Sequence, residues 1–519
     1  MCADVCRISL SLLIILAVCA APCFGAGSEP SGTADRAELL AAYTAAEARL
    51  KAGDASAEVW NQILEALYRL DQPQKALGAA RVAAKEHAQD PEVLGHIARA
   101  YYRGGFPDEA AKLFDKLVPR QSDPVSAVVQ SKLLHSEGRV RFALDIALRT
   151  LIHAPQDAEL QYQAALLYGW LGRSTEAAAH FESALKSAAD LKGYPRDLIV
   201  SRAKARSLMY GAAQDKTVNT VSATGSFTFV RGTKLRLPTV QVQLNGQGPV
   251  NMLLDLGGGA TLSLDTTVAH EAGIKVLGEG QILDVTGGAS DTKWALTDVM
   301  VLGDCHIQTV ATQIYPFNES DLPGLKGIVG AGLFARKRMV VDFDKRRVGI
   351  EESIPSGPIT GSTRLHSPLE VRFLSGDQPI VRVQLKDVTV NAIFDIGTPV
   401  SCFSTHQMTA LKSASAIREA DFGDIRAKIS TRIPFRIARR TFAQGRTYAL
   451  PFIDKETSSG VGMQVDMLLG WDVFTEMRRF TIDAPARKII IDWRPPRDSA
   501  SPPAKPPKQP QNPPTINPD

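Results

Sequence analysis

The chain has 519 residues, of which 44% are hydrophobic and 22% charged, and its formal net charge is +4. This length exceeds what one hydrophobic core usually supports, so we expect several domains. The small net charge, with no basic stripe, argues against nucleic-acid binding. The nine histidines show no zinc-site spacing, and no phosphate-binding loop or nucleophilic serine elbow is found. We therefore predict no metal ion and no cofactor.

Residues 1–26 predict a signal peptide that directs export. A basic residue precedes an apolar run over 8–18, and small residues follow at 25–27. The expected location is therefore periplasmic or secreted. Two alternatives stay open, because the apolar run can be extended to about twenty residues, as in an uncleaved anchor, and because Cys19 or Cys23 offers a lipidation site. Only in those two cases would the chain be attached to a membrane.

Residues 34–190 are rich in alanine and leucine at helical spacing, and the pattern repeats. A small residue near the start of every second helix recurs at steps of 34, 33 and 34 residues, at Ala76, Ala110, Ala143 and Ala177. This pattern resembles the tetratricopeptide repeat (TPR). The resemblance implies four helical pairs stacked into an α-solenoid, preceded by an extra helix over 34–52. Asp90-Pro91 and Asp123-Pro124 are typical helix starts.

The resemblance to TPR proteins also implies a concave helical surface that holds a peptide or a partner protein. The alternative is a rigid spacer that covers the next domain. Residues 191–222 contain one more helical segment, which would cap the solenoid, and a linker. From Val218 onward, alternation with period two replaces helical spacing, so we expect strands up to residue 494. The Pro-rich tail over 495–519 cannot bury apolar surface and is predicted to be disordered.

The β-rich part contains two copies of one pattern, at 223–354 and 365–494. Leu-Leu-Asp-Leu-Gly at 253–257 recurs as Ile-Phe-Asp-Ile-Gly at 393–397, exactly 140 positions later. An apolar-apolar-Gly sequence ends at Gly330 and recurs at Gly470, again 140 positions later. A repeat that keeps its register over several landmarks indicates two copies of one domain.

Each copy resembles the retropepsin-like aspartic proteases. The resemblance is carried by Asp-x-Gly, by Thr261 and Ser401 six positions after the aspartates, and by the later glycines. Since pepsin-like enzymes carry two such lobes in one chain, it implies an all-β, bilobal acid-protease fold after the solenoid. It also implies that Asp255 and Asp395 are catalytic. Their loops would be supported by Gly257, Gly397, Thr261, Ser401, Gly330 and Gly470.

The chemistry that two such aspartates perform is acid–base catalysis. Two carboxyl groups about 3 Å apart cannot both ionise easily, so they share one proton. The ionised group accepts a proton from water, and the protonated group donates to the carbonyl oxygen of a peptide bond. We therefore predict an exported aspartic endopeptidase that cleaves a peptide or protein substrate. The TPR-like region would recruit that substrate or a protein partner.

Two further features qualify this prediction. A substrate-covering flap is expected in the first copy, at Thr286, Gly287 and Gly288, whereas the charged region at 420–432 of the second copy is less hairpin-like.

Leu256 and Ile396 stand where the family has a hydroxyl side chain that joins a hydrogen-bond network between the two loops. Loss of that network could cost a few kcal/mol of preorganisation. The alternative hypothesis is therefore a catalytically inactive, peptide-binding scaffold. In a third, weaker hypothesis the protein forms a dimer in which each copy pairs with the same copy of a second chain.

Overall fold

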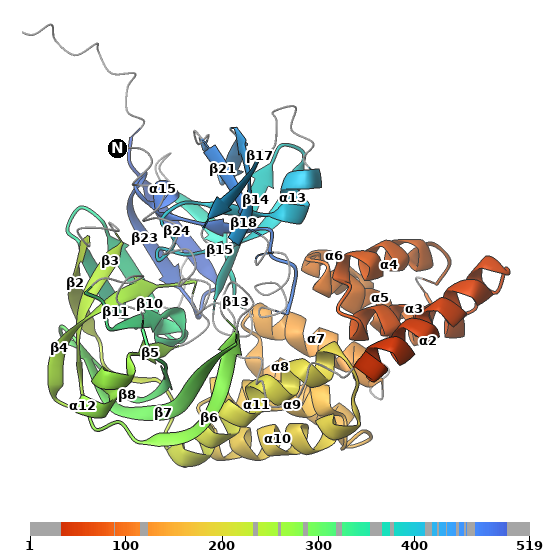
Figure 1. The fold of residues 1–519 in the computed structure, drawn as a ribbon, viewed down its shortest axis with the longest axis horizontal. Helices are drawn as coiled ribbons and strands as arrows, with labels where there is room; N and C mark the ends of the chain where they lie inside the picture. The colour runs from red at the N-terminus through yellow and green to blue at the C-terminus, as the bar shows by residue number, and fades with distance from the viewer. Residues whose placement is uncertain are drawn as a thin grey trace, which may run out of the picture.

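The computed structural model describes residues 33–87, 89–114, 123–231, 237–257, 261–283, 289–317, 324–352, 366–373, 378–410, 418–422, 425–431, 433–442, 446–450, 453 and 462–495. A helical region comes first and a β-rich region follows (Figure 1). The predicted signal peptide, the flap residues Thr286, Gly287 and Gly288, and the tail after residue 495 lie outside the described residues. None of the described helices is both long and apolar enough to cross a bilayer.

Successive helices pack against one another through the whole helical region. They are α2 (Thr33–Lys51), α3 (Ala57–Arg69), α4 (Pro73–His87), α5 (Pro91–Arg103), α6 (Pro107–Phe114), α7 (Pro124–Ser136), α8 (Val140–Leu151), α9 (Ala158–Trp170), α10 (Ser174–Ser187), the short η1 (Ala188–Asp190) and α11 (Tyr194–Ala213). The repeated alanine is the fourth residue of α4, α6, α8 and α10, and it is at most 3% exposed in each. A small side chain there lets neighbouring helices approach closely.

Two of the helix starts show why the sequence folds this way locally. The side chain of Asp90 accepts a hydrogen bond from the backbone N–H of Glu92. The side chain of Asp123 accepts hydrogen bonds from the backbone N–H groups of Val125 and Ser126 in α7. Proline follows each aspartate, and its missing N–H is not needed at a first helical position. Both helices therefore begin where the sequence predicts.

The strands of the first copy form a closed barrel within a larger 14-stranded sheet. The barrel strands β3, β4, β9, β5, β8 and β7 follow one another in hydrogen-bonded order, and β7 pairs with β3 to close the ring. The strands are β1 (Thr220–Ala223), β2 (Gly225–Arg231), β3 (Pro238–Leu244), β4 (Gln247–Asp255), β5 (Leu262–Leu264), β6 (Val276–Leu283), β7 (Ala289–Leu302), β8 (Cys305–Ile314), β9 (Gly327–Gly330), β10 (Arg338–Asp342) and β11 (Arg347–Glu351). The short helices α12 (Thr266–Glu271) and η2 (Ala331–Phe334) lie between them in sequence.

The second copy forms an open half-barrel of ten strands. The half-barrel strands are β13 (Arg372–Phe373), β14 (Pro379–Leu385), β15 (Val388–Phe394), β16 (Cys402–Ser404), β17 (Arg418–Phe422), β18 (Ile425–Thr431), β19 (Phe435–Ile437), β20 (Arg440–Phe442), β21 (Arg446–Leu450) and β22 (Met467–Leu469). The second copy also adds three strands to the 14-stranded sheet, which are β12 (His366–Glu370), β23 (Met477–Asp483) and β24 (Lys488–Trp493). The short helices α13 (Thr405–Ala410) and α15 (Trp471–Phe474) accompany them.

The predicted bilobal fold of two like lobes was therefore wrong, although helices do precede strands. The first copy closes because β7 is 14 residues long and reaches both β8 and β3. Its counterpart 140 positions later is broken into β18, β19 and β20, with Pro434 between β18 and β19. Proline has no N–H for a sheet hydrogen bond and interrupts a central strand. No pairing closes the second ring among the described residues.

The two copies are joined by a shared edge. β10 of the first copy pairs antiparallel with β23 of the second, with Val340 opposite Thr481 and Val341 opposite Phe480. Because 340 and 480 are equivalent positions of the repeat, this register relates the copies by a local two-fold axis. The region at 420–432, expected to be less hairpin-like, includes β18 and the end of β17, and these two strands pair antiparallel.

Two apolar clusters of the described residues join the helical region to the β-rich region. Side chains of α5 and α7 share a core with the outer face of the half-barrel, where Ile393 and Leu468 contribute. α11 lies along β7 of the barrel and along β6, which pairs with β7 (Figure 1), and Met209 packs there with Trp294. Trp294 is thus a buried packing residue at this contact.

Candidate active site

The two aspartates lie at the ends of equivalent buried strands. β4 pairs parallel with β9, with Leu253 opposite Ile328, and β15 pairs parallel with β22, with Ile393 opposite Leu468. These pairs are the same positions of the repeat, 140 residues apart. The apolar residues just before each aspartate are fully buried, so hydrophobic burial fixes each strand and carries the following carboxyl group into the interior.

The structure brings Asp255 and Asp395 together around one backbone amide. The Gly257 N–H donates to Oδ1 of Asp255 at 2.8 Å and to Oδ1 of Asp395 at 3.0 Å. The Gly397 N–H donates to Asp395 Oδ1 at 2.8 Å, and the Thr398 hydroxyl donates to Asp395 Oδ2. The two side chains are 0% and 2% exposed. Two buried carboxyl groups from separate copies therefore share a hydrogen-bond donor.

The glycine of each Asp-x-Gly sequence lies against the carboxyl group of the other copy. A Cβ atom at Gly257 would lie 2.4 Å from Cγ of Asp395, and one at Gly397 would lie 2.7 Å from Cγ of Asp255. Carbon atoms do not approach this closely without displacement, so only glycine allows both loops to meet. The contact is reciprocal, as the local two-fold axis requires.

The other predicted loop residues form a frame behind the aspartates. The Gly330 N–H donates to the Thr261 carbonyl at 2.9 Å, and the Thr261 hydroxyl accepts from the Asn219 amide at 3.1 Å. In the second copy, the Ser401 hydroxyl accepts from the Gly470 N–H at 2.9 Å. A Cβ atom at Gly470 would lie 2.4 Å from the backbone of Val400. These residues hold the two loops in place.

Leu256 and Ile396 pack in the apolar core, at 1% and 0% exposure, so they contribute no hydrogen bond between the loops. A different residue provides one. The side-chain amide of Gln378, which is 1% exposed and precedes β14, donates to the carbonyl of Gly257. This bond ties the second copy to the loop that follows Asp255. This hydrogen bond from Gln378 therefore partly replaces the network between the loops that Leu256 and Ile396 cannot form.

Replacing Gln378 by methionine is expected to lower stability by about 1–3 kcal/mol, because the Gly257 carbonyl loses a buried donor. Urea unfolding measures the effect. Gln384→Met, in the strand that follows Gln378, is the control, because that side chain bonds to the nearby Lys386 carbonyl and to Thr389 rather than to the aspartate loops. Equal stability of the two variants would contradict this role.

Asp472 is a third carboxyl group in this frame. Its Oδ1 accepts from the Ser401 backbone N–H at 2.7 Å and from the Ser401 hydroxyl at 2.9 Å, while its Oδ2 is buried with no partner among the described residues. Burial raises the pKa of Asp472 from 3.8 to about 6, although the hydrogen bonds from Ser401 act in the opposite direction. The residue at the equivalent position of the first copy is Gly332.

This raised pKa predicts a pH dependence of stability. Between about pH 4 and pH 6 the unfolded chain releases the Asp472 proton before the folded chain does, so the free energy of unfolding falls as the pH rises through this window. Asp472→Asn keeps the acceptor for Ser401 and should remove the fall, a gain of up to roughly 3 kcal/mol at neutral pH. Urea unfolding at several pH values tests this, with the exposed Asp387→Asn as control. Parallel pH profiles of wild type and Asp472→Asn would contradict it.

Sequence reasoning selected the residues that meet at the aspartates but missed Thr398, Gln378, Asp472 and Asn219. Thr398 directly follows Gly397, and Asp472 lies two positions after Gly470, so their position was a usable signal. Gln378 and Asn219 act on residues 121 and 42 positions away, respectively, and no local pattern marks such contacts. The described residues contain no group of three or more side chains suited to hold a metal ion.

Comparisons with known proteins give partial likenesses. No protein-family model matches the chain, and no curated protein sequence matches it. A crystal structure of basic 7S globulin from soybean is 11% identical, with a TM-score of 0.31, over 53% of this chain and 95% of that one. MamA from Desulfovibrio magneticus RS-1, from residue 41 to its end, is 19% identical with a TM-score of 0.24, covering 31% of this chain and 85% of that one.

The TPR2AB domain of yeast Sti1, in its pHSP90 complex, is 15% identical with a TM-score of 0.15, covering 34% of this chain and 82% of that one. The soybean protein thus aligns with about half of the chain, and the two helical proteins with about a third each. Because every TM-score is below 0.5, these likenesses assign neither a family nor an activity to the chain.

Proposed function

We propose that this protein is an aspartic-type endopeptidase in which Asp255 and Asp395 act as one acid–base pair. The observation that carries the proposal is the Gly257 amide, which donates to a carboxyl oxygen of each aspartate. In the proposed reaction the two carboxyl groups hold one proton between them. Such a pair can give and take a proton in the same step.

The reaction then follows from this pair. Its ionised member takes a proton from a water molecule, whose oxygen attacks the carbonyl carbon of the peptide bond. The protonated member donates its proton to the carbonyl oxygen, which yields a neutral tetrahedral intermediate. When the intermediate collapses, one of its hydroxyl groups returns a proton to the ionised member of the pair, and the protonated member gives its proton to the nitrogen. The carbon–nitrogen bond breaks, the amine leaves, and a carboxylic acid remains while the pair again holds one proton. Gly257 and Gly397 keep the two loops close enough for this exchange.

The test is cleavage of a denatured protein by the purified full chain, from strongly acid to mildly basic pH, in water enriched in oxygen-18. The proposal expects new amino termini, one heavy oxygen atom in each new carboxyl terminus, and inhibition by pepstatin. A covalent serine or cysteine mechanism would not be blocked by pepstatin. Absence of cleavage at every pH would overturn the proposal.

A second candidate function is a peptide-binding scaffold without catalysis. The specific observation in its favour is that Leu256 and Ile396 leave the loops without the usual hydroxyl groups. Pepstatin binding without cleavage would support this function, as would activity gained when both residues are replaced by threonine. Cleavage by the unaltered protein would exclude it. In both cases we propose an exported protein whose helical region binds a partner or substrate.

A further inference from the structure

The turn between α5 and α6 lies against the strand that carries Asp395. Asn391 is on that strand, β15, four positions before the aspartate, and it is 3% exposed. Its side-chain Nδ2 donates to the Gly105 carbonyl in the turn at 2.9 Å and to the Gln464 carbonyl at 3.1 Å. The Gln464 N–H in turn donates to the carbonyl of Arg103, the last residue of α5, at 2.8 Å. Three hydrogen bonds therefore join the helical turn to β15 and to the segment that leads into β22.

The close fit at this contact requires glycine in the turn. Gly105 has a φ of +90°, and a Cβ atom there would lie 2.8 Å from Asn391 Nδ2 and 3.2 Å from the Gln464 carbonyl oxygen. Gly53, in the turn after α2, has a similar φ of +96°, but a Cβ atom there would meet nothing within 4 Å among the described residues. The left-handed backbone is thus common to both helical turns, whereas the close approach belongs to the turn beside β15.

The first copy has the same residue type at the equivalent position, but there it is exposed. Asn251 lies four positions before its aspartate, as Asn391 does. The backbone carbonyl groups of the two asparagines accept equivalent hydrogen bonds at 2.9 Å, from the N–H groups of Lys326 and Asp466. The side chain of Asn251 is exposed, whereas that of Asn391 is buried. A buried amide needs partners, and in the second copy the α5–α6 turn supplies one.

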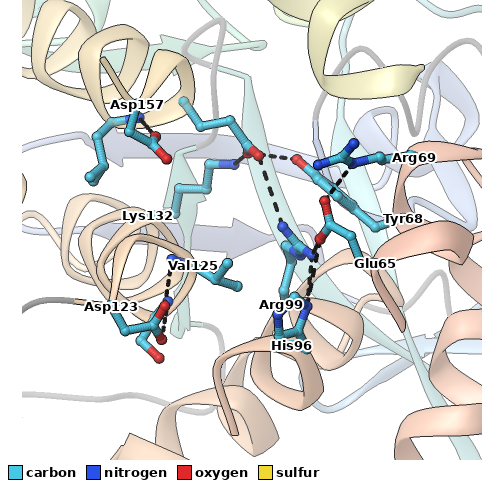
Figure 2. Close-up of polar contacts among 12 residues, drawn as sticks. Glu65, Tyr68, Arg69, His96, Arg99, Asp123, Val125, Lys132 and Asp157 are labelled. Carbon is cyan, nitrogen blue, oxygen red and sulfur yellow. Dashed lines mark hydrogen bonds and ion pairs between the residues drawn. The ribbon is translucent and has the colours of Figure 1, made fainter. Parts of the chain in front are cut away.

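α5 holds this turn firmly, because its buried arginines bind the neighbouring helical elements. Arg103 donates to the Tyr194 hydroxyl of α11 at 2.7 Å and to the Asp71 carboxylate. One helical turn earlier, Arg99 donates to the Glu65 carboxylate of α3, as Figure 2 shows. Both arginine side chains are buried, where ion pairs are screened much less by salt than at the surface. The end of α5 is therefore a fixed support for the turn.

α6 contacts the strand beside β15. Asp108, in the first turn of α6, forms ion pairs with Arg372 of β13 and Arg382 of β14. Arg382 is the residue directly opposite Asn391 in the antiparallel pair of β14 and β15. The α5–α6 segment therefore holds two neighbouring strands at the same level of the sheet, four residues before Asp395.

We propose that Asn391 is a positioning residue for Asp395, through which the α5–α6 turn fixes the position of β15. A shift of this strand would move Asp395 relative to the Gly257 N–H, which also bonds to Asp255. Proton exchange in the aspartate pair depends steeply on such distances, because a misplacement of about 1 Å can cost about a hundredfold in rate. The kinetic consequence rests on the proposed peptidase function, whereas the support of β15 by the helices does not.

Two substitutions disturb the contact from its two sides. Asn391→Leu keeps the approximate size of the side chain but removes the donors, and Gly105→Ala displaces the turn. Each is expected to lower kcat per folded molecule about tenfold or more and to change KM less than about twofold, since a misplaced Asp395 weakens stabilisation of the transition state rather than substrate binding. The matched controls, Asn251→Leu in the first copy and Gly53→Ala in an open turn, should keep both constants.

Backbone hydrogen exchange, followed by mass spectrometry of proteolytic fragments, gives a readout that needs no activity. In Asn391→Leu and Gly105→Ala, the amides of β15 are expected to exchange at least about tenfold faster, because local opening of the strand needs less free energy once its support is lost. The amides of β4, the equivalent strand of the first copy, should keep their wild-type rates in both variants. The two control variants should leave both strands unchanged.

Three results would overturn the proposal. One is wild-type exchange of β15 in folded Asn391→Leu and Gly105→Ala. Another is an equal acceleration of β4 and β15, since the contact would then contribute only to overall stability. The third is an unchanged kcat per folded molecule in both variants. If the wild-type protein cleaves nothing, the peptidase function fails, and the exchange rates of β15 alone decide whether Asn391 holds this strand.

Discussion

Replacing Asp255 or Asp395 by asparagine is expected to lower peptide cleavage by about a thousandfold or more. Either substitution leaves one carboxyl group that can no longer exchange a proton with its partner. The double variant should be no worse than either single one, because the two groups act as a unit. Single-turnover cleavage of a denatured protein, followed by mass spectrometry of the products, measures the loss.

The fold should survive these substitutions. An asparagine side chain keeps an oxygen that accepts the Gly257 N–H, which bonds to both aspartates. Asp298→Asn in β7 is the matched control, because that aspartate is exposed on the barrel. Unfolding curves of all variants separate loss of chemistry from loss of structure. Wild-type rates in both folded Asp255→Asn and Asp395→Asn would exclude the pair as the catalytic group.

Adding one methyl group at Gly257 or Gly397 should be nearly as harmful. Each Cβ atom would overlap the carboxyl group of the other copy, at 2.4 Å and 2.7 Å from its Cγ atom. The loops must separate, and we expect a loss in cleavage rate of about a hundredfold or more with a loss in stability of about 1–3 kcal/mol. Steady-state kinetics and urea unfolding report the two effects.

Gly349→Ala provides the matched control for these substitutions. Gly349 lies in β11, and a Cβ atom there would meet nothing closer than the Glu351 side chain at 3.8 Å. That variant should keep both its activity and its stability. If Gly257→Ala and Gly397→Ala behave like Gly349→Ala, the close contact between the two aspartate loops is wrong.

The sequence was informative wherever short-range patterns decide structure. Alanine every 33 or 34 residues predicted the helical pairs, because a small side chain is needed where two helices meet. The 140-residue repeat predicted that Asp255 and Asp395 occupy equivalent strand ends. A two-fold relation between equivalent positions then brings equivalent groups together, which explains why the pairing of the aspartates could be anticipated.

Long-range consequences could not be anticipated in this way. Pro434 is a single residue, yet it interrupts the strand that would close the second barrel. Gln378 bonds to a loop 121 positions earlier, and its role depends on the path of both chains. The packing of Trp294 on α11 likewise required the helices to be in place. Each of these depends on tertiary contacts that local propensity does not encode.

The strand before Asp395 has helices on one side and the protein interior on the other. Ile393 packs with α5 and α7, whereas its neighbour Phe394 faces the opposite core. Asn391 on the same strand donates to the Gly105 carbonyl, in the turn between α5 and α6, at 2.9 Å. The repeats thus serve as an outer wall for the copy whose ring stays open. In evolutionary terms they are not an exchangeable module, since a recombination event that swapped them for another array would strip one half of the duplicated domain of its covering.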